Sequence, residues 1–469
     1  MNQAAIKQAY FLGIGGIGMS AIARYFHSMG IQVLGYDRTE TSLTKELIAE
    51  GIAVHYEDLG ENLQALQLNK ENCLVVLTPA VPKDHREWNW LQQQGYTILK
   101  RSQVLGIITD AYQTIGVAGT HGKTTTSTLL AHLLKQSHID TAAFLGGIST
   151  NYGTNLLLHK ANKSSKEQWM VVEADEFDRS FLTLHPAIGI ITSTDADHLD
   201  IYGEHDALKK SFADYAIQVT QTLFIKKELN LFDEFSEEMK EQKQVYSYSI
   251  IQQADVWANH ITIEGDRYWF DLHYFNQTIS KLYLGIPGRH NVENAVAASA
   301  AALNAGITET ELREGLSSFT GVKRRFEYII KSKNLLYIDD YAHHPEELRA
   351  IIGSVKQMYA GKKITIIFQP HLYSRTRDFA DGFAESLSMA DDAILMDIYP
   401  ARELPIQGVS SEMILNKMTL KEKCLCSKAN LLSTVDHKQP EVLLTLGAGD
   451  IDQFVEPLKI LLEQRITVK

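Results

Sequence analysis

The stretch Gly116-Val-Ala-Gly119-Thr120-His121-Gly122-Lys123-Thr124-Thr125-Thr126 decides the fold of the middle of this chain. An apolar, strand-like run over 113–118 precedes it, and a helix-like run over 124–135 follows it. A strand, a glycine turn and a Lys-Thr pair that opens a helix form a phosphate cradle, because backbone N–H groups and the positive helix end face the anion. We therefore expect a nucleoside triphosphate site in which the lysine binds the terminal phosphates and the threonine hydroxyl binds Mg²⁺.

This loop departs from the common phosphate-loop pattern at one position. That pattern has a glycine five residues before the Gly-Lys pair, and Val117 occupies the position here. The loop is thus a variant, Gly-Thr-His-Gly-Lys-Thr-Thr. The alternative interpretation is a glycine turn before a purely structural helix.

Composition indicates a globular, multidomain protein. The chain has 469 residues, of which 45% are hydrophobic and 22% charged, enough for two to four domains. No apolar run approaches the roughly 18 residues of a membrane span, and the first residues lack signal-peptide features. Three cysteines make no disulfide framework, and a net charge of −12 argues against nucleic-acid partners. We expect a cytoplasmic protein without membrane insertion, a monomer or weak homodimer that acts on small molecules.

A second glycine loop lies near the start of the chain. A strand over 9–13 continues as Gly13-Ile-Gly15-Gly16-Ile17-Gly18, and a helix is expected over 19–29. The next strand, 31–36, ends at Asp37, nineteen residues after Gly18. This is the form of a dinucleotide fingerprint, with close backbone approach to a diphosphate and an acid that can bond a ribose. NAD, FAD or a UDP-sugar would fit, and an unliganded tight turn is the alternative.

Two further segments complete this first region. A strand over 73–77 continues into Thr78-Pro-Ala-Val-Pro, at a strand's carboxyl end, where ligands of α/β proteins bind. Leu99-Lys-Arg101 then leads into a short helix and a boundary near Asp110.

Two consecutive strands of the middle region end in possible metal ligands. The strand over 169–173 ends at Glu173 and continues into Asp175 and Glu176, where a nucleotide-hydrolysing enzyme places the carboxylate that binds Mg²⁺. The strand over 187–191 continues into an Asp-rich stretch that contains His198. Zinc is the alternative for this histidine, but no second His or Cys lies at ligand spacing.

The rest of the middle region alternates in polarity. The segment 245–286 predicts a small antiparallel sheet whose aromatic residues belong to a core. Asn291 and Asn294 then lie three residues apart at the start of an alanine-rich helix. They can cap that helix or bind a base edge.

The last third predicts a parallel sheet. Apolar strands over 335–339, 364–368, 393–397 and 442–446 each end in a polar loop before a helix. Pro345 suits the first position of a helix, so we expect His343 and His344 to be exposed at its N-terminal end. Arg324 and Arg325 resemble a phosphate clamp, with a solvated basic face as the alternative.

Cys424 and Cys426 are expected in a polar, lysine-rich loop. A lone C-x-C without a matching pair argues against a metal there.

Eight motifs in order carry a family resemblance. They are GIGGIGMS at 13–20, GTHGKTTT at 119–126, EADEFDRSFL at 173–182, DADHLD at 195–200, GRHNVENAVAA at 288–298, RRFE at 324–327, DDYAHHPEE at 339–347 and FQPHLYSRTRDF at 368–379. Together they resemble the Mur ligases over essentially the whole chain. The resemblance implies three α/β domains: a Rossmann-like UDP-sugar-binding domain (1–108), a central P-loop ATPase-type domain with a small antiparallel sheet (109–320) and a Rossmann-like amino-acid-binding domain (321–469).

The resemblance also implies an activity in peptidoglycan precursor synthesis. ATP phosphorylates a carboxylate to an acyl phosphate, an amine attacks it, and an amide and phosphate result. Within the family the first and last motifs are most similar to the alanine-adding branch, which implies ATP, Mg²⁺, UDP-N-acetylmuramate and L-alanine. Such a transfer depends on positioning and charge neutralisation more than on covalent help from the protein.

Roles follow from the resemblance position by position. The implied catalytic residues are Lys123, Glu173, His198, His343 and Arg375. The implied ATP-binding residues are Gly119, Thr120, His121, Gly122, Lys123, Thr124, Thr125, Asn291, Asn294, Arg325 and Asp340. The implied UDP-sugar-binding residues are Gly15, Gly16, Ile17, Gly18, Asp37 and Thr78. Tyr341, His371, Arg375 and Arg377 are implied for the amino acid, and Thr124, Glu173 and His198 for Mg²⁺.

Two positions depart from relatives. Sister ligases carry a carbamylated lysine where Phe212 stands here, as expected for the alanine-adding branch, so Lys209 and Lys210 are given no role. Relatives often have arginine at position 372, which is a leucine here.

Three other functions stay open at this point. A recycling ligase would attach a ready-made tripeptide to the same UDP-sugar. A nicotinamide dehydrogenase would explain the first glycine loop but leaves Lys123, Glu173 and His198 without a purpose. A P-loop switch would bind nucleotide without forming an amide.

Overall fold

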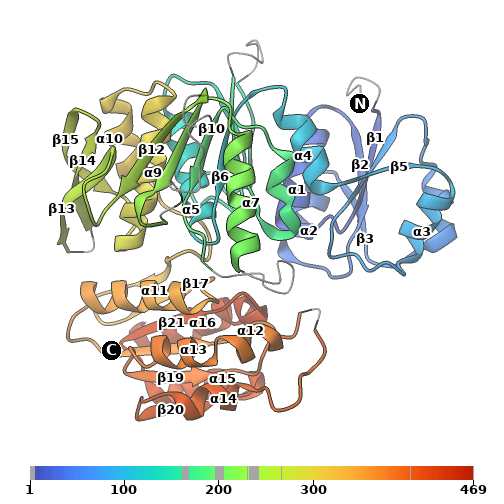
Figure 1. Cartoon of the computed structure of the whole chain (residues 1–469). Coiled ribbons are helices and arrows are strands. Elements are labelled where there is room, and N and C mark those ends of the chain that lie inside the picture. The colour runs from blue at the N-terminus through green and yellow to red at the C-terminus, as the bar shows by residue number, and fades with distance from the viewer. Residues whose placement is uncertain are drawn as a thin grey trace. The chain divides into compact units, whose positions relative to one another are not determined.

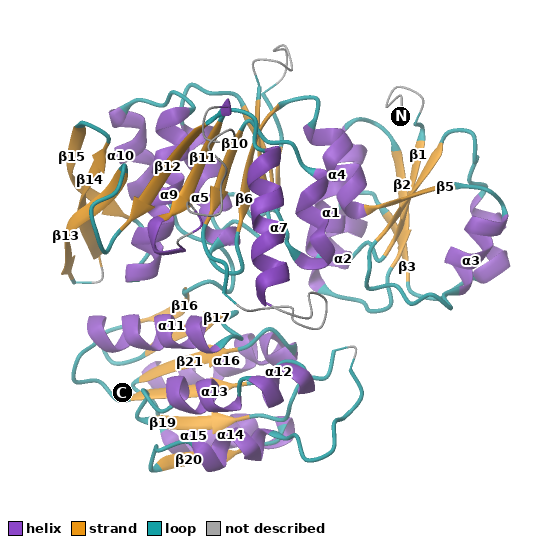
Figure 2. Cartoon of the chain, in the orientation of Figure 1, coloured by secondary structure: helices purple, strands orange, loops and turns teal. Residues whose placement is uncertain are grey.

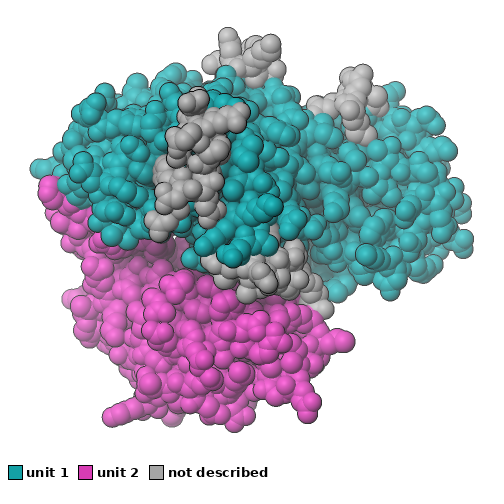
Figure 3. All heavy atoms as spheres, in the orientation of Figure 1, with its two compact units in different colours: residues 1–259, 271–282, 294–319 teal, residues 260–270, 283–293, 320–469 magenta. Residues whose placement is uncertain are grey.

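The computed structural model describes residues 6–160, 168–195, 205–229, 231, 242–265, 267–401 and 403–467. The chain divides into two compact units, coloured separately in Figure 3. The first comprises residues 1–259, 271–282 and 294–319, and the second 260–270, 283–293 and 320–469. No described helix has the combination of length and apolarity that crossing a membrane requires.

The first region of the chain forms a five-stranded parallel sheet in the order β3-β2-β1-β4-β5. The strand order reverses between β1 and β4, so the loops after these two strands flank the crevice where α/β sheets bind ligands. Its strands are β1 (Gln8–Leu12), β2 (Gln32–Tyr36), β3 (Ala53–His55), β4 (Cys73–Leu77) and β5 (Thr97–Lys100). Its helices are α1 (Ile17–Ser28), α2 (Ser42–Ala49), the 3₁₀ helix η2 (Gly60–Leu66), α3 (Arg86–Gln93) and α4 (Arg101–Thr109).

Side-chain alternation along β1 explains why both faces of this sheet are covered. Ala9 and Phe11 join a core with residues of α1, α2 and α4, whereas Tyr10 and Leu12 join a second core with residues of η2 and α3. Figure 2 shows the corresponding placement, with α1 and α4 on one side of the sheet and α3 on the other. A strand buried on both faces carries a continuous apolar run, and after the partly buried Gln8 the four remaining residues of β1 are all buried and non-charged.

The central sheet has ten strands, in the order β15-β14-β13-β12-β11-β10-β6-β9-β7-β8. Its strands are β6 (Gln113–Ala118), β7 (Thr141–Phe144), β8 (Leu156–Leu157), β9 (Trp169–Glu173), β10 (Ile188–Ile191), β11 (Thr222–Lys226), β12 (Gln244–Ser249), β13 (Val256–Glu264), β14 (Arg267–Tyr274) and β15 (Gln277–Leu284). Its helices are α5 (Lys123–Gln136), η4 (Phe177–Thr183), α7 (His205–Gln218), η5 (Lys227–Leu229), α9 (Arg289–Asn304) and α10 (Glu309–Ser318). Strands β6, β9 and β10 are parallel neighbours, so their carboxyl ends meet at one edge.

The small antiparallel sheet expected over 245–286 is part of the central sheet. The alternating strands β13, β14 and β15 exist, but they continue the central sheet through β12 rather than standing apart. Pairing of Tyr248 with Val256 makes this connection.

The first sheet and the parallel part of the central sheet share one hydrophobic core. Tyr25 of α1 packs on Phe144 of β7, with ring centroids 5.5 Å apart. Phe212 of α7 is fully buried in the same core and meets Phe181 edge to face. An apolar side chain therefore fills this position, and no lysine is available there for carbamylation.

The C-terminal sheet has the order β16-β17-β21-β18-β19-β20, with β16 antiparallel and the others parallel. Its strands are β16 (Glu327–Lys331), β17 (Leu336–Asp340), β18 (Ile364–Phe368), β19 (Asp392–Leu395), β20 (Glu422–Leu425) and β21 (Val442–Leu446). Its helices are α11 (Pro345–Met358), α12 (Tyr373–Asp378), α13 (Ala380–Leu387), α14 (Ser411–Lys417), η7 (Lys428–Asn430), α15 (Leu431–Lys438), η8 (Asp450–Phe454) and α16 (Val455–Thr467). Two cores cover its faces, one with α11, α13 and α14 and the other with α15 and α16 (Figure 1).

The three mixed α/β sheets confirm the predicted fold class, with Rossmann-like first and last domains around a P-loop domain. The expected loop around the cysteines is wrong: Cys424 lies in β20, and Cys426, which follows it, is buried.

Candidate active site

The phosphate loop links β6 to α5 through two glycines in backbone conformations that other residues seldom adopt. Gly119 has φ +141° and Gly122, the N-cap of α5, has φ +81°. A Cβ on Gly119 would overlap the hydroxyl of Thr192. The glycine at position 119 is therefore required both by the backbone conformation and by the close approach of Thr192.

A second loop, after β10, supports the phosphate loop from behind. The Ser193 hydroxyl accepts the His121 N–H at 2.6 Å and lies 2.9 Å from the Thr120 hydroxyl. The Asp195 N–H donates to the Thr120 hydroxyl at 3.1 Å. These bonds fix the shape of the loop, and Ser193 is a supporting residue that no motif in the sequence indicates.

Lys123 has a partner that the sequence analysis did not assign to it. Its ammonium lies 2.7 and 2.9 Å from the two oxygens of Glu176, a carboxylate with 1% side-chain exposure, and 2.5 Å from the Gly119 carbonyl. Burial alone would lower the pKa of Lys123, but the charges of Glu176, Glu173 and Asp175 outweigh it and raise that pKa. The lysine is therefore held charged inside the loop.

Glu173 ends β9 directly beside the phosphate loop, paired in register with Val117 of β6. The loop after β7 packs on its carboxylate so closely that a Cβ on Gly146 would overlap it. Thr124, which follows the lysine, is buried in the first turn of α5. A hydroxyl and a carboxylate are the oxygen ligands that Mg²⁺ prefers, so these two residues fit that ion chemically. The third expected ligand, His198, lies outside the described residues.

The two asparagines near the start of α9, Asn291 and Asn294, are both buried. The Asn291 side-chain amide donates to the backbone carbonyl of Pro287 at 2.5 Å. The side-chain oxygen of Asn294 accepts a hydrogen bond from the Thr126 hydroxyl at 3.2 Å. Asn294 also lies close behind Gly122, where a Cβ would be 2.8 Å from its oxygen. This residue therefore packs against the phosphate loop.

The first glycine loop is closed by Asp37. One oxygen of this carboxylate accepts the Gly15 N–H at 2.8 Å and the other accepts the Thr39 N–H at 3.2 Å. Gly13, at φ +87°, contacts Thr78 of the loop after β4 so closely that a Cβ would overlap that side chain. The predicted loop residues thus lie together at the switch point of the sheet, with Gly16, Ile17 and Gly18 at the start of α1.

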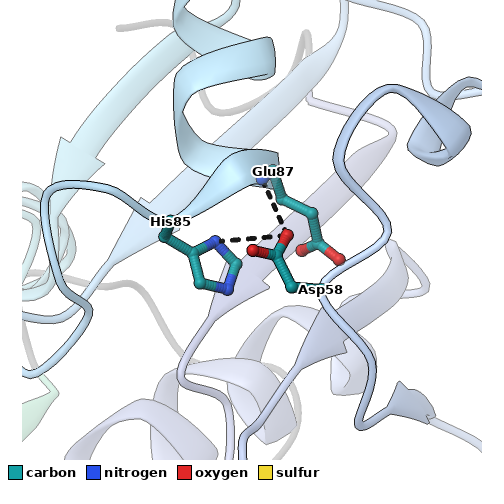
Figure 4. A group of neighbouring side chains, drawn as sticks. All are labelled: Asp58, His85 and Glu87. Atoms are coloured by element: carbon teal, nitrogen blue, oxygen red, sulfur yellow. Dashed lines mark hydrogen bonds and ion pairs between the residues drawn. The ribbon is translucent and has the colours of Figure 1, made fainter.

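Asp58, His85 and Glu87 form the cluster drawn in Figure 4. They lie in segments that follow β3 and β4 of the first sheet. Both Glu87 oxygens are occupied: one accepts the Tyr10 hydroxyl at 2.6 Å and the other the Leu59 N–H at 2.9 Å. Asp58 accepts the Glu87 N–H at 3.0 Å. Since these bonds use the carboxylate oxygens, the cluster is explained as a brace between β1, the loop before η2 and α3.

Asp340 ends β17 and is buried. Its two oxygens accept the N–H groups of Phe326 and Ala342, each at 2.7 Å. Burial raises the pKa of Asp340 to about 6, although Arg325 and the two N–H groups oppose the shift. The Arg325 guanidinium lies 5.1 Å from the ring centroid of Tyr341 and 3.7 Å from Glu347.

The two histidines before α11 differ from expectation. Pro345 starts that helix as predicted, but His344 is its N-cap and is 5% exposed, because its ring packs on Phe379. The expected exposure is therefore wrong for His344. His343 is partly buried, and its Nδ1 lies 3.2 Å from Glu347.

The loop after β18 brings only part of the expected amino-acid site together. His371 stacks on Tyr399 at 5.8 Å and lies 6.0 Å from His343. Arg375 in α12 is buried, whereas Arg377 is exposed and pairs with its neighbour Asp378 at 2.7 Å. The residue before α12, Leu372, adopts a left-handed backbone at φ +69°.

Arg324, predicted together with Arg325 as a phosphate clamp, has partners within its own domain. Its guanidinium bonds Asp339 at 3.1 Å and the Gly447 carbonyl at 2.7 Å. These are contacts with the sheet of its own domain, so this arginine stabilises the carboxyl edge of that sheet.

Comparison with known families accounts for nearly the whole chain. The model of the Mur ligase family catalytic domain matches residues 8–113, that of the Mur ligase middle domain 117–302, and that of the Mur ligase glutamate ligase domain 324–450. The chain belongs to the Mur ligase family, whose members are ATP-dependent ligases.

Particular relatives are similar over their full length. The UDP-N-acetylmuramate–L-alanine ligase of Flavobacterium johnsoniae is 47% identical over 99% of this chain and 100% of the relative. That of Porphyromonas gingivalis is 50% identical over 97% and 98%. The crystal structure of the UDP-N-acetylmuramate-alanine ligase of Thermotoga maritima superposes with a TM-score of 0.81 at 26% identity, covering 98% of this chain and 100% of that one. Membership in a ligase family argues against the dehydrogenase and switch hypotheses.

Proposed function

We propose that this protein joins L-alanine to the carboxylate of UDP-N-acetylmuramate, with ATP converted to ADP and phosphate. The observation that carries the proposal is the full-length similarity, near 50% identity, to ligases of that name. The phosphate loop and the first glycine loop, each closed by its own hydrogen bonds, support it. The product would be a precursor of peptidoglycan, made in the cytoplasm.

The reaction would proceed through an acyl phosphate. The substrate carboxylate attacks the γ-phosphorus of ATP, and ADP leaves. The amine of L-alanine then adds to the acyl carbon, loses a proton and displaces phosphate, which leaves the amide. Lys123 would neutralise the transferring phosphoryl oxygens, and Thr124, Glu173 and His198 would bind Mg²⁺, which supplies further charge neutralisation.

The remaining roles are proposals of the same kind. Asn291 and Asn294 would bind adenine, with Arg325, Asp340 and His343 as further ATP-binding or catalytic groups. Gly15, Gly16, Ile17, Gly18 and Thr78 would bind the UDP-sugar, with Asp37 holding their loop. Tyr341, His371, Arg375 and Arg377 would bind the amino acid. The three regions 1–108, 109–320 and 321–469 would serve the UDP-sugar, ATP and the amino acid in that order.

Phosphate release tests this proposal. The purified protein is incubated with ATP, Mg²⁺ and UDP-N-acetylmuramate, and with L-alanine, with L-alanyl-γ-D-glutamyl-diaminopimelate, or with no amine; Lys123→Met serves as the inactive control. Release that depends on L-alanine, with the amide detected by mass spectrometry, is expected. Release with the tripeptide alone would instead identify a recycling ligase, and silence with both amines would contradict ligase activity.

Size-exclusion chromatography with light scattering, at several protein concentrations, tests the expected monomer or weak homodimer. A mass independent of concentration and larger than a dimer would contradict it.

A further inference from the structure

Arg101, the first residue of α4, lies between the first glycine loop and the acidic segment that follows β9. Its guanidinium is close to the first turn of α1, where a Cβ on Gly18 would be 2.8 Å from Nη1 and 3.5 Å from Cζ. Its Nη2 donates to an oxygen of Asp175 at 2.9 Å. The side chain is 19% exposed. One guanidinium therefore contacts both loops.

The acidic segment 173–176 places three carboxylates in three different contacts. Glu173 faces the Gly146 loop, Glu176 holds Lys123, and Asp175 lies between them in the sequence. The second oxygen of Asp175 accepts the Phe177 N–H at 3.1 Å. Asp175 thus fixes the start of η4 and at the same time binds Arg101.

The backbone after Asp175 leaves little freedom for this segment. Asp178 and Arg179 both have left-handed conformations, at φ +52° and +54°. Thr183 at its far end donates its hydroxyl to the Ser102 carbonyl of α4 at 2.9 Å. A displacement of Arg101 would therefore act on the segment that carries Glu173 and Glu176.

We propose that Arg101 is a substrate-binding and positioning residue: it binds the diphosphate of the UDP-sugar at Gly18 and, through Asp175, couples that binding to the ATP loop. The inference rests on the proposed function. An arginine presents five N–H donors in a rigid fork, and the bond to Asp175 leaves others for an anion. The N-terminus of α1, which has no acidic residue in its first turn, adds its positive end at the same place.

The neighbouring lysine provides a matched control. Lys100 pairs with Asp178 at 3.4 Å, but its side chain is 59% exposed and lies on the solvent side of the same junction. It has a similar charge and a contact to the same segment, yet we assign it no substrate.

Calorimetry without turnover tests the inference. The dissociation constants of UDP-N-acetylmuramate, of a non-hydrolysable ATP analogue, and of each in the presence of the other are measured for wild type, Arg101→Met, Arg101→Lys, Asp175→Asn and Lys100→Met. In the wild type we expect each ligand to tighten the other by about fivefold or more, because coupling is reciprocal. Arg101→Met should weaken the UDP-sugar by about tenfold or more and abolish the coupling.

Asp175→Asn separates the two parts of the inference. It should keep UDP-sugar affinity within about threefold of wild type yet lose most of the coupling, and Lys100→Met should change neither. Arg101→Lys keeps the positive charge but lacks the planar guanidinium with its several N–H donors. It therefore tests the inference even if the methionine variant does not fold. UDP-sugar affinity unchanged in both Arg101 variants, or coupling that is absent from the wild type or survives in Asp175→Asn, would overturn the inference. Failure of the ligase reaction itself would appear separately, as missing amide in the phosphate-release experiment.

Discussion

Glu176 pairs with Lys123 inside the phosphate loop and keeps its ammonium charged. Glu176 is buried and the Lys123 side chain is only 12% exposed, so removing one of them leaves the other as a largely buried, uncompensated charge at a cost of about 3–5 kcal/mol. Lys123→Met and Glu176→Gln should therefore each lower the free energy of unfolding by an amount in this range. The double variant should recover most of that loss in chemical denaturation, yet remain inactive in phosphate release. A double variant as unstable as the sum of the single ones would show that the pair is not coupled.

Gly146 should be required for the position of Glu173. A methyl group there would overlap the carboxylate, so Gly146→Ala should displace it and reduce kcat by about tenfold or more, with a raised Mg²⁺ requirement. The magnesium dependence of phosphate release measures this. Gly353→Ala is the control, because a Cβ at that helical position meets only Met389 at 3.6 Å, an ordinary contact. Equal magnesium dependence in both variants and in wild type would contradict the assignment.

At the residue scale, local spacing predicted the loops but not the partners across them. The Gly-Lys-Thr order and the strand before it suffice to place Lys123 at the junction of β6 and α5. Glu176 lies 53 residues later, and nothing in the spacing distinguishes it from Glu173 or Asp175 as the partner of the lysine. Only the register of β6 with β9 and the left-handed turn at Asp178 decide which carboxylate faces inward.

Among the secondary-structure elements, α5 carries a buried titratable group. His132 lies between the Tyr152 hydroxyl and the Ser318 hydroxyl, 3.0 Å from each, and connects α5 to α10. Burial lowers the pKa of His132 to about 4, against a small opposing effect of Gly315. The unfolded chain, with an ordinary histidine pKa near 6.5, binds this proton more readily.

The free energy of unfolding should therefore fall as the pH drops from about 6.5 to about 4. Above about pH 6.5 His132 is neutral in both the folded and the unfolded chain and no longer makes stability depend on pH. His132→Gln keeps a hydrogen-bonding side chain that does not titrate. Between about pH 4 and 6.5 its unfolding should take up as much as one proton fewer than that of the wild type, so its denaturation midpoint should depend less steeply on pH. The exposed His27→Gln is the control. Wild type and His132→Gln with parallel pH profiles would contradict this account.

Apolar runs predicted the central strands well because these strands are buried on both faces. Strands β6, β18 and β21 have the bounds that the sequence indicated, and each is almost wholly buried. Edge strands were missed: β20, at one end of the C-terminal sheet, has exposed and partly buried residues and reads as polar loop. An edge strand needs no continuous apolar run, so its sequence carries a weaker signal.

For the molecule as a whole, Arg24 joins the first domain to the central one. This buried arginine of α1 binds Glu50, the C-cap residue of α2, at 2.6 Å and donates to the side-chain amide oxygen of Asn155 at 2.6 Å. Asn155 in turn donates to the Ile17 carbonyl, also at 2.6 Å. Arg24→Met would leave a buried amide oxygen without this donor, at a cost of about 1–3 kcal/mol.

The expected result of Arg24→Met is early opening of the first sheet. Hydrogen exchange should accelerate over 8–109 at temperatures where 113–144 keeps its protection, and calorimetry should show a separate low-temperature transition. Lys45→Met, which removes an exposed ion pair with Glu40 in the same domain, should leave both unchanged. A single transition shifted as a whole would mean that the two domains unfold together whether or not Arg24 is present.

Composition predicted two to four domains, and the eight ordered motifs, through their resemblance to the Mur ligases, predicted a three-domain α/β ligase. The contacts between the first two domains could not be predicted in the same way. Arg24 in the first helix and Asn155 in the central region are 131 positions apart, and both belong to residue types that are ordinarily exposed.

The segment from Glu173 to Thr183 also has an evolutionary consequence. Glu173 contacts the loop after β7, Glu176 contacts α5, and Asp175 and Thr183 both contact α4, while two consecutive left-handed residues lie among them. Gaining or losing a single residue here would shift at least one of these contacts out of place. Descendants of this gene should therefore tolerate substitution in this segment far more readily than insertion or deletion, which should gather in the turns at the ends of β13, β14 and β15 instead.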